Sequence, residues 1–168
     1  FMSVFFGALT IIILFYLLRR WFGLKIASVA TFLLTLSPMF VRYGQEMRMY
    51  MLVFFIVALA TYVLDIALET KKTRYYILYA ILISLGMWTH YFTAIAWLAH
   101  IIYYTATRRA KIWDKKFLLT YALAVLLYIP WIPSFLAQTN SVQSGFWIPE
   151  LSFGTAASYI SEALIFKD

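Results

Sequence analysis

The amino-acid sequence predicts an all-α protein whose helices form a bundle across a membrane. Of its 168 residues, 64% are hydrophobic and only 12% are charged, which is too little charge to cover a water-soluble domain. The apolar residues come in runs long enough to face lipid on all sides. Without the alternating pattern of strands, such runs must satisfy their own backbone hydrogen bonds, and they therefore predict helices.

About six membrane helices are expected, including one short hairpin. They form a single partial transmembrane domain over residues 1–168, with a segment outside the membrane from residue 133 onward. The predicted spans are residues 1–18, 26–41, 49–68, 75–88, 91–106 and 117–132.

Basic residues set the expected topology. The net charge of +7 is carried mostly by short clusters within residues 19–25, 71–74 and 108–116, not by one groove-sized patch, so no nucleic-acid partner is predicted. Basic loops beside membrane helices favour the cytoplasmic side, and we place all three clusters there. An even number of spans must then separate any two of them.

This count predicts a helical hairpin within residues 75–106, because one long helix would place one basic cluster outside. Two short helices meeting near "MWTHYF" keep both clusters inside. A helix over residues 75–88 reaches only about 21 Å, against roughly 30 Å of hydrocarbon, so its tip and His90 should lie within the membrane's depth.

The last predicted span stops at "IPWIP", where Pro130 and Pro133 break the helix and Trp131 suits the membrane interface. Residues 134–150 are predicted to form a polar outer loop. Ser152 is then expected to cap a short amphipathic helix lying along the membrane surface.

The stretch "SPMFVRYGQEMRMY" joins the second and third spans and should face the extracytoplasmic side. We expect Pro38 to end one helix and Gly44 to precede the next. If that helix begins near Gln45, its dipole favours an anion at Glu46 in the first turn. The same dipole disfavours a cation at Arg48, which therefore needs a partner of its own.

On such a helix a polar edge would point at whatever packs beside the helix start. Gln45, Arg48 and Leu52 share one face, and Glu46 with Tyr50 share the next.

Two explanations compete for these charges. Arg42 and Glu46, four residues apart, suit a solvated ion pair, and Arg48 can extend to lipid headgroups. Alternatively, Arg48 grips a phosphate, whose oxygens match the guanidinium fork, while Glu46 orients it or binds a hydroxyl. Ionisable groups at membrane depth favour the functional explanation for Arg48.

The remaining polar residues within the spans admit simpler explanations. His90, beside Tyr91 at the hairpin tip, is first interpreted as hydrogen-bonded structure, with cavity lining as the alternative. His100, among aromatic residues, is interpreted as packing. Asp65 and Glu69 are expected at the interface or paired with Lys72.

Several chemistries have no motif in the chain. The sequence lacks GxGxxG, a Walker loop, HExxH and Gly-x-Ser-x-Gly, and it has no cysteine. No cofactor and no metal ligands are predicted, and a metal requirement is left open.

Three motifs resemble the bacterial branch of the GT-C membrane glycosyltransferases, which includes protein O-mannosyltransferase-like proteins and the lipid A aminoarabinose transferase. "LSPMFVRYGQEMRMYML" is similar to the family's S-P-x-x-x-x-Y-x-Q-E-x-R-x-Y pattern, and "WTHYF" resembles its hairpin tip. "LYIPWIPSFLAQ" followed by "FWIP" is similar to its outer loop after the seventh span. The resemblance covers nearly the whole chain.

The resemblance implies transfer of a sugar from a polyprenyl-phosphate carrier to an acceptor glycan, lipid or protein on the outer face of the bacterial cytoplasmic membrane. It implies that Arg48, Gln45, Glu46 and Tyr50 line the cavity where lipid phosphate and sugar meet. The family's catalytic carboxylate lies in its first outer loop, which would precede Phe1. We therefore expect a fragment that lacks the first span and has no catalytic base of its own.

Two other classes of protein stay open at this point. A transporter or lipid flippase component would use Arg48, Glu46 and His90 to line a path, and should show inverted repeats or interrupted helices. A structural membrane subunit would use the same polar residues as an interface.

Overall fold

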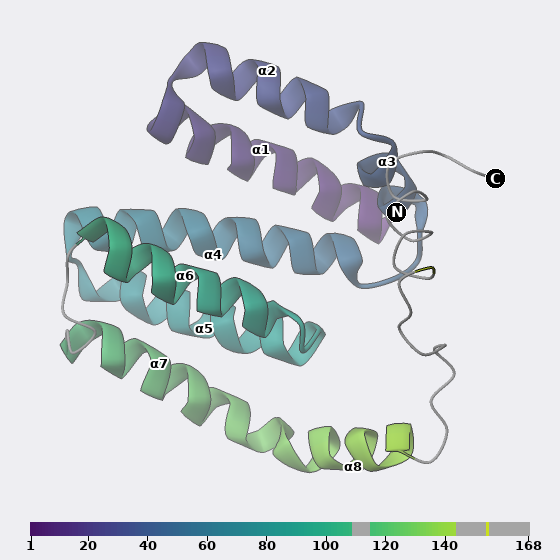
Figure 1. Ribbon diagram of the computed structural model, residues 1–168, viewed down its shortest axis with the longest axis vertical. Coiled ribbons are helices and arrows are strands. Elements are labelled where there is room, and N and C mark those ends of the chain that lie inside the picture. The colour runs from purple at the N-terminus through teal and green to yellow at the C-terminus, as the bar shows by residue number, and fades with distance from the viewer. Residues whose placement is uncertain (109–114, 144–153, 155–168) are drawn as a thin grey trace. The chain divides into compact units, whose positions relative to one another are not determined.

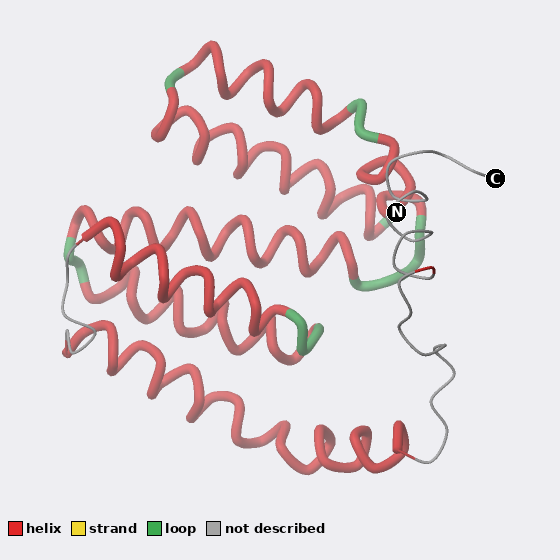
Figure 2. Tube along the Cα trace, in the orientation of Figure 1, coloured by secondary structure: helices red, strands yellow, loops and turns green. Residues whose placement is uncertain are grey.

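The computed structural model describes residues 1–108, 115–143 and 154, and these residues form helices and short connections without a strand (Figures 1 and 2). The predicted all-α class is therefore confirmed, and the chain is an integral membrane protein by the length and apolarity of its helices. It divides into two compact units, Phe1–Pro130 and Trp131–Asp168, each of which is described by itself.

The first unit is built from α1 to α7, and α4 lies at its centre. α4 packs against α1 and α5, and α5 packs in turn against α7. In the most apolar 18-residue stretch of α4, 50% of the residues are buried. In the corresponding stretch of α1 only 17% are buried, so most of its apolar side chains are left to face lipid. The helices are α1 (Met2–Phe22), α2 (Leu24–Thr35), α3 (Pro38–Gln45), α4 (Tyr50–Thr70), α5 (Thr73–Thr89), α6 (Thr93–Arg108) and α7 (Lys115–Tyr128).

Among the described residues, three segments are long and apolar enough to cross a membrane: α1, α4 and Lys115–Asn140. A fourth is added if α2 and α3 together form one broken span. The helices α5 and α6 have 17 and 16 residues and are shorter than the 18 residues required of a full span, as expected for a short hairpin. The predicted six spans are therefore not confirmed.

The predicted span over residues 26–41 is in fact two helices that meet at a bend of 57°. α2 ends at Thr35, and Ser37 is the N-cap of α3, with Pro38 in its first turn. The prediction that Pro38 ends a helix was wrong in direction, because the first helical position has no partner for an N–H and suits proline. Gly44 lies inside α3, not before a new helix.

The predicted span over residues 49–68 agrees with the start of the next helix, whereas the alternative start near Gln45 was too early. α4 begins at Tyr50, so Glu46 is the C-cap of α3, with its N–H donating to the Arg42 carbonyl at 3.2 Å. Arg48 lies in the turn between the two helices. The shared helix faces expected for Gln45, Arg48 and Leu52, and for Glu46 and Tyr50, do not exist.

The hairpin turns at the motif that was expected to form its tip. α5 ends at Thr89 and α6 begins at Thr93, so His90, Tyr91 and Phe92 form the turn. The His90 N–H donates to the Gly86 carbonyl at 2.8 Å, and the Thr93 hydroxyl donates to the His90 carbonyl at 2.8 Å. These bonds satisfy backbone groups at the ends of both helices.

The second unit begins near the two prolines. Ile129–Trp131 form a 3-10 turn, and α8 (Ile132–Gln143) follows, with Pro133 in its first turn, where proline is tolerated. The predicted loop was therefore wrong for residues 134–143, which are helical. The rest of that loop and the expected amphipathic helix lie outside the described residues, except for Gly154.

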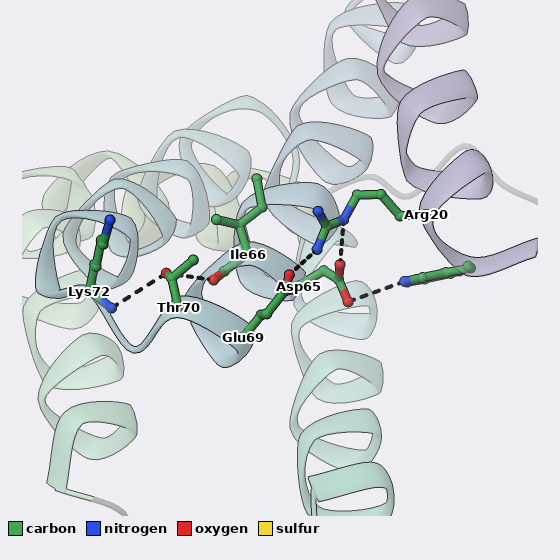
Figure 3. A network of polar contacts seen from close by, with 7 residues as sticks. Arg20, Asp65, Ile66, Glu69, Thr70 and Lys72 are labelled. Carbon is green, nitrogen blue, oxygen red and sulfur yellow. Dashed lines mark hydrogen bonds and ion pairs between the residues drawn. The ribbon is translucent and has the colours of Figure 1, made fainter. Parts of the chain in front are cut away.

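A polar network joins α1 to α4 at the end where the basic loops lie. Arg20 donates from Nε to Asp65 at 2.9 Å and from Nη2 to Glu69, and the Trp21 indole N–H donates to Asp65 at 3.2 Å. Figure 3 shows the Arg20 side chain reaching across to both carboxylates. The expected partner Lys72 is replaced by Arg20, 45 residues away from Asp65.

We expect Asp65→Asn to lower the free energy of unfolding by about 1 kcal/mol. The amide oxygen keeps the bond from Arg20, but the charge and the second acceptor, which binds the Trp21 indole N–H, are lost. Glu69→Gln is the matched control, since the Glu69 side chain is 60% exposed and an exposed ion pair contributes little. Thermal unfolding in detergent measures both. An equal loss in the two variants would contradict the central place given to Asp65.

Candidate functional site

The polar residues singled out in the sequence gather at the opposite end of the first unit. α3, the turn after it, the start of α4 and the tip of the α5–α6 hairpin all lie there. The Ser3 hydroxyl donates to the Glu46 carbonyl at 2.5 Å, which ties this turn to the start of α1. The Tyr50 and His90 rings are 6.2 Å apart between centroids, which brings α4 against the hairpin tip.

Arg42 and Glu46 form the ion pair that the sequence left as one alternative. Arg42 Nε lies 3.6 Å from Glu46 Oε1, and the Arg42 side chain is 66% exposed. Such a pair contributes little stability because water screens it. The pair does, however, place a cation beside Glu46, the only carboxylate at this end among the described residues.

Arg48 has a different environment. It is exposed in the turn between α3 and α4, and within the described ranges no carboxylate lies in ion-pair distance of it. It precedes Tyr50, the first residue of α4, by two positions, and the N-cap residue Met49 makes no side-chain cap bond. A cation therefore lies beside free N–H groups at the positive end of a 21-residue helix, a combination that attracts an anion.

A row of aromatic rings runs from α3 to the hairpin tip. Tyr43 meets Tyr50 edge to face at 5.0 Å between centroids, and beyond Tyr50 the His90 ring lies 5.2 Å from that of Phe92. His90 Nδ1 accepts the Phe92 N–H at 3.3 Å, which supports a structural part for this histidine. Tyr91 is half-buried in the same turn, and Gln45 is exposed at the end of α3.

A groove of about 400 Å³ opens between α2, α3 and α4 beside this row. Its walls are almost wholly apolar, and Tyr50, which faces it, is two residues from Arg48. The groove could not be predicted without the bend that separates α2 from α3. The pair Ser37 and Pro38, a cap followed by an N1 proline, was the available signal for that bend. The lining residues are Leu34, Ser37, Met39, Phe40, Tyr43, Tyr50, Met51 and Phe54.

Metal ligands do not cluster in the described part of the chain, where no group of three or more histidine or carboxylate side chains is arranged to hold an ion. The chemistry offered by this end is therefore that of a cation, an apolar groove and aromatic faces.

A family model described as dolichyl-phosphate-mannose-protein mannosyltransferase matches residues 1–133, which include the groove, the turn and the hairpin. Neither a curated protein nor a solved structure matches the chain.

Proposed function

Because the chain belongs to the dolichyl-phosphate-mannose-protein mannosyltransferase family of membrane glycosyltransferases, we propose that it takes part in moving a sugar from a polyprenyl-phosphate carrier to an acceptor. The acceptor is a glycan, lipid or protein outside the cytoplasmic membrane of a bacterium. The architecture is that of a GT-C-type enzyme, and the carrier is the substrate, with no further cofactor assigned.

The observation that carries this proposal is the position of Arg48 next to an apolar groove. A lipid phosphate has an anionic head and a hydrocarbon tail, and the turn before α4 offers a cation and free N–H groups for the first. The groove beside Tyr50 offers apolar walls for the second. Arg42 is a second cation six residues earlier, in the last turn of α3, and it is already paired with Glu46.

The sugar then lies over the aromatic row. With the phosphate at Arg48, the neighbouring faces are those of Tyr50 and His90, and Gln45 and Tyr91 supply polar atoms at the rim. The acceptor hydroxyl attacks the anomeric carbon, its proton passes to a base, and the bond to the carrier phosphate breaks. Arg48 stabilises the charge on the departing phosphate.

No residue of the described chain is assigned as the catalytic base. Glu46 is engaged by Arg42 through the ion pair described above, and the resemblance assigns the family's carboxylate to another loop. Sidedness follows from charge: the basic loops at the far end of the unit favour the cytoplasm, which leaves the turn before α4 outside.

Replacing Arg48 tests this assignment. In the full-length protein we expect Arg48→Ala to slow release of polyprenyl phosphate by about 100-fold, since one lost donor at a developing charge costs that much. Arg48→Lys should restore part of the rate. Membrane insertion should be unchanged because Arg48 is exposed.

Arg42→Ala is the matched control, because it removes an equal charge from the same surface. The Arg42 guanidinium is already bound to Glu46, so its loss should slow release less than the loss of Arg48. Near-normal turnover by Arg48→Ala, or equal losses in both variants, would overturn the assignment of Arg48.

A lipid flippase or transporter is the second candidate, favoured by the break between α2 and α3. Helices interrupted within the membrane occur at the binding sites of transporters, and this pair bends by 57°. Proteoliposomes carrying a lipid-linked sugar separate the two functions. A transferase releases polyprenyl phosphate when an acceptor is added, whereas a flippase moves the intact lipid between leaflets and releases nothing. A structural subunit does neither.

A further inference from the structure

The end of the first unit far from Arg48 carries a concentration of positive charge that sugar transfer does not use. We call it the basic corner. The described carboxylates nearest to it, Asp65 and Glu69, are both bound by Arg20. The basic corner consists of the exposed residues Lys71, Lys72, Arg74, Lys115 and Lys116, at the α4–α5 turn and the start of α7.

One of these cations is held in place by the fold. Lys116 of α7 donates from Nζ to the Lys71 carbonyl at 2.7 Å and lies 6.0 Å from the centre of the Tyr76 ring. Lys71 itself ends α4 in the left-handed conformation, with φ of 56°, which turns the chain toward α5. A fixed ammonium group loses less conformational freedom when it binds an anion than a free one does.

A groove of about 120 Å³ begins at this ammonium group and runs between α5 and α7. Thr73 and Lys116, at the starts of the two helices, form its polar end, and the residues beyond them are mostly apolar, which is the pattern of a phospholipid from headgroup to acyl chain. The lining residues are Thr73, Tyr76, Ile77, Lys116, Leu119, Thr120 and Leu123.

The neighbouring hollow at the same end has the opposite character. It has a volume of about 350 Å³ and is lined by Arg20, Trp21, Asp65 and Glu69, so two carboxylates face one guanidinium. An anion is disfavoured there by like charge. The preference for an anion is therefore local to the basic corner, not a property of the whole end.

We propose that the basic corner is a binding site for an anionic phospholipid of the surrounding leaflet. One acyl chain lies in the groove between α5 and α7, and the phosphate contacts Lys116 together with Lys72 or Arg74. Basic pockets between membrane helices are known to attract such headgroups. The proposal does not depend on the proposed transfer activity.

Photo-crosslinking of the full-length protein tests the site. The protein is placed in phosphatidylcholine vesicles with a trace of phosphatidylglycerol that carries a photoreactive acyl chain, and labelled peptides are identified by mass spectrometry. We expect labelling on α5 and α7, and a roughly fivefold drop with Lys116→Gln, the effect of one cation near an anionic headgroup. A photoreactive phosphatidylcholine should label these peptides weakly.

Lys25→Gln is the matched control, because it removes one exposed cation from the first turn of α2 at the same end. It should leave labelling of α5 and α7 unchanged. Leu119→Trp keeps every charge but fills the groove, and it should also reduce labelling. The fold should tolerate the larger side chain because Leu119 is 58% exposed. Equal loss in Lys116→Gln and Lys25→Gln, equal labelling by both lipids, or full labelling of Leu119→Trp would each overturn the proposal.

Discussion

Gly86→Ala is expected to destabilise the protein by about 2 kcal/mol, although alanine usually strengthens a helix. A Cβ atom at Gly86 would lie 2.5 Å from Cζ2 of Trp97 and 3.4 Å from the Thr93 hydroxyl oxygen. The Trp97 side chain is buried, with 4% exposure, so the rigid indole cannot swing away. The added methyl group overpacks the core at a cost of about 3 kcal/mol, the upper end of the usual range. This cost outweighs the gain of about 1 kcal/mol from the higher helix propensity of alanine.

Gly7→Ala is the matched control, because Gly7 is also buried in a membrane helix. A Cβ there would meet its neighbours at 3.7 Å or more, which is ordinary contact. This variant should gain up to about 1 kcal/mol. The two substitutions are therefore expected to move the melting temperature in detergent in opposite directions.

A double-mutant cycle isolates the contact itself. Trp97→Phe removes the ring atoms that the new methyl group would strike, so Gly86→Ala should cost much less in that background, with a coupling energy of about 1 kcal/mol or more. Additive losses would show that Gly86 matters for another reason. Because Gly86 also accepts the His90 N–H, the single variant should disturb the hairpin tip beside Tyr50.

The α5–α6 hairpin is a feature that the sequence alone could predict. Counting spans between basic loops predicted a turn near His90, because the sidedness of charge constrains helix number without any knowledge of packing. The close approach of Gly86 to Trp97 was out of reach, since it depends on which faces of α5 and α6 meet. The same limit applies to Asp65, whose partner Arg20 lies on α1.

The errors at the candidate site have a local cause. Proline and glycine were both taken as helix ends, yet Pro38 begins α3 and Gly44 lies within it. Proline at a first turn and glycine inside a short helix are both permitted, so each signal has two meanings. The polar cluster was located by charge alone, whereas the groove beside it required the bend.

His100 packs as the sequence indicates, but it also makes hydrogen bonds that the sequence did not predict. Its ring packs 5.5 Å from Trp97 and 5.7 Å from Tyr79, as expected of a packing residue. Both ring nitrogens are also hydrogen-bonded, to Thr61 and to the Tyr79 hydroxyl, at 2.9 Å each. These partners are 39 and 21 residues away, and no local pattern reveals them.

The bonding pattern determines where the protons lie. The Thr61 hydroxyl donates to the Val57 carbonyl at 2.7 Å, so its oxygen can only accept from His100 Nε2. Nδ1 is then the acceptor, and the Tyr79 hydroxyl donates to it. The Tyr79 oxygen also lies 3.0 Å from the Tyr121 hydroxyl, which donates to the Trp97 carbonyl at 3.3 Å. The result is a neutral imidazole protonated at Nε2, which nitrogen-15 NMR of the labelled histidine can read directly.

His100→Leu is expected to lower the free energy of unfolding by about 2 kcal/mol, the upper end for hydrogen bonds between membrane helices. It removes the bonds to Thr61 and to the hydroxyl of Tyr79, a side chain with no exposed surface. The hydrogen-bonded chain through His100 joins residues of α4, α5, α6 and α7, so the substitution weakens the contact among all four helices. Thermal unfolding and hydrogen exchange of the hairpin would measure the loss.

The other histidine provides the control for this prediction. The His90 side chain is half-buried, and its one hydrogen bond among those described stays within its own turn, so His90→Leu should cost under about 0.5 kcal/mol. Adding Thr61→Val to His100→Leu should cost less than the sum of the two changes, since the pair removes both partners of one bond. A protonated Nδ1, or additive losses in that pair, would refute the proton arrangement and leave ring packing as the whole contribution of His100.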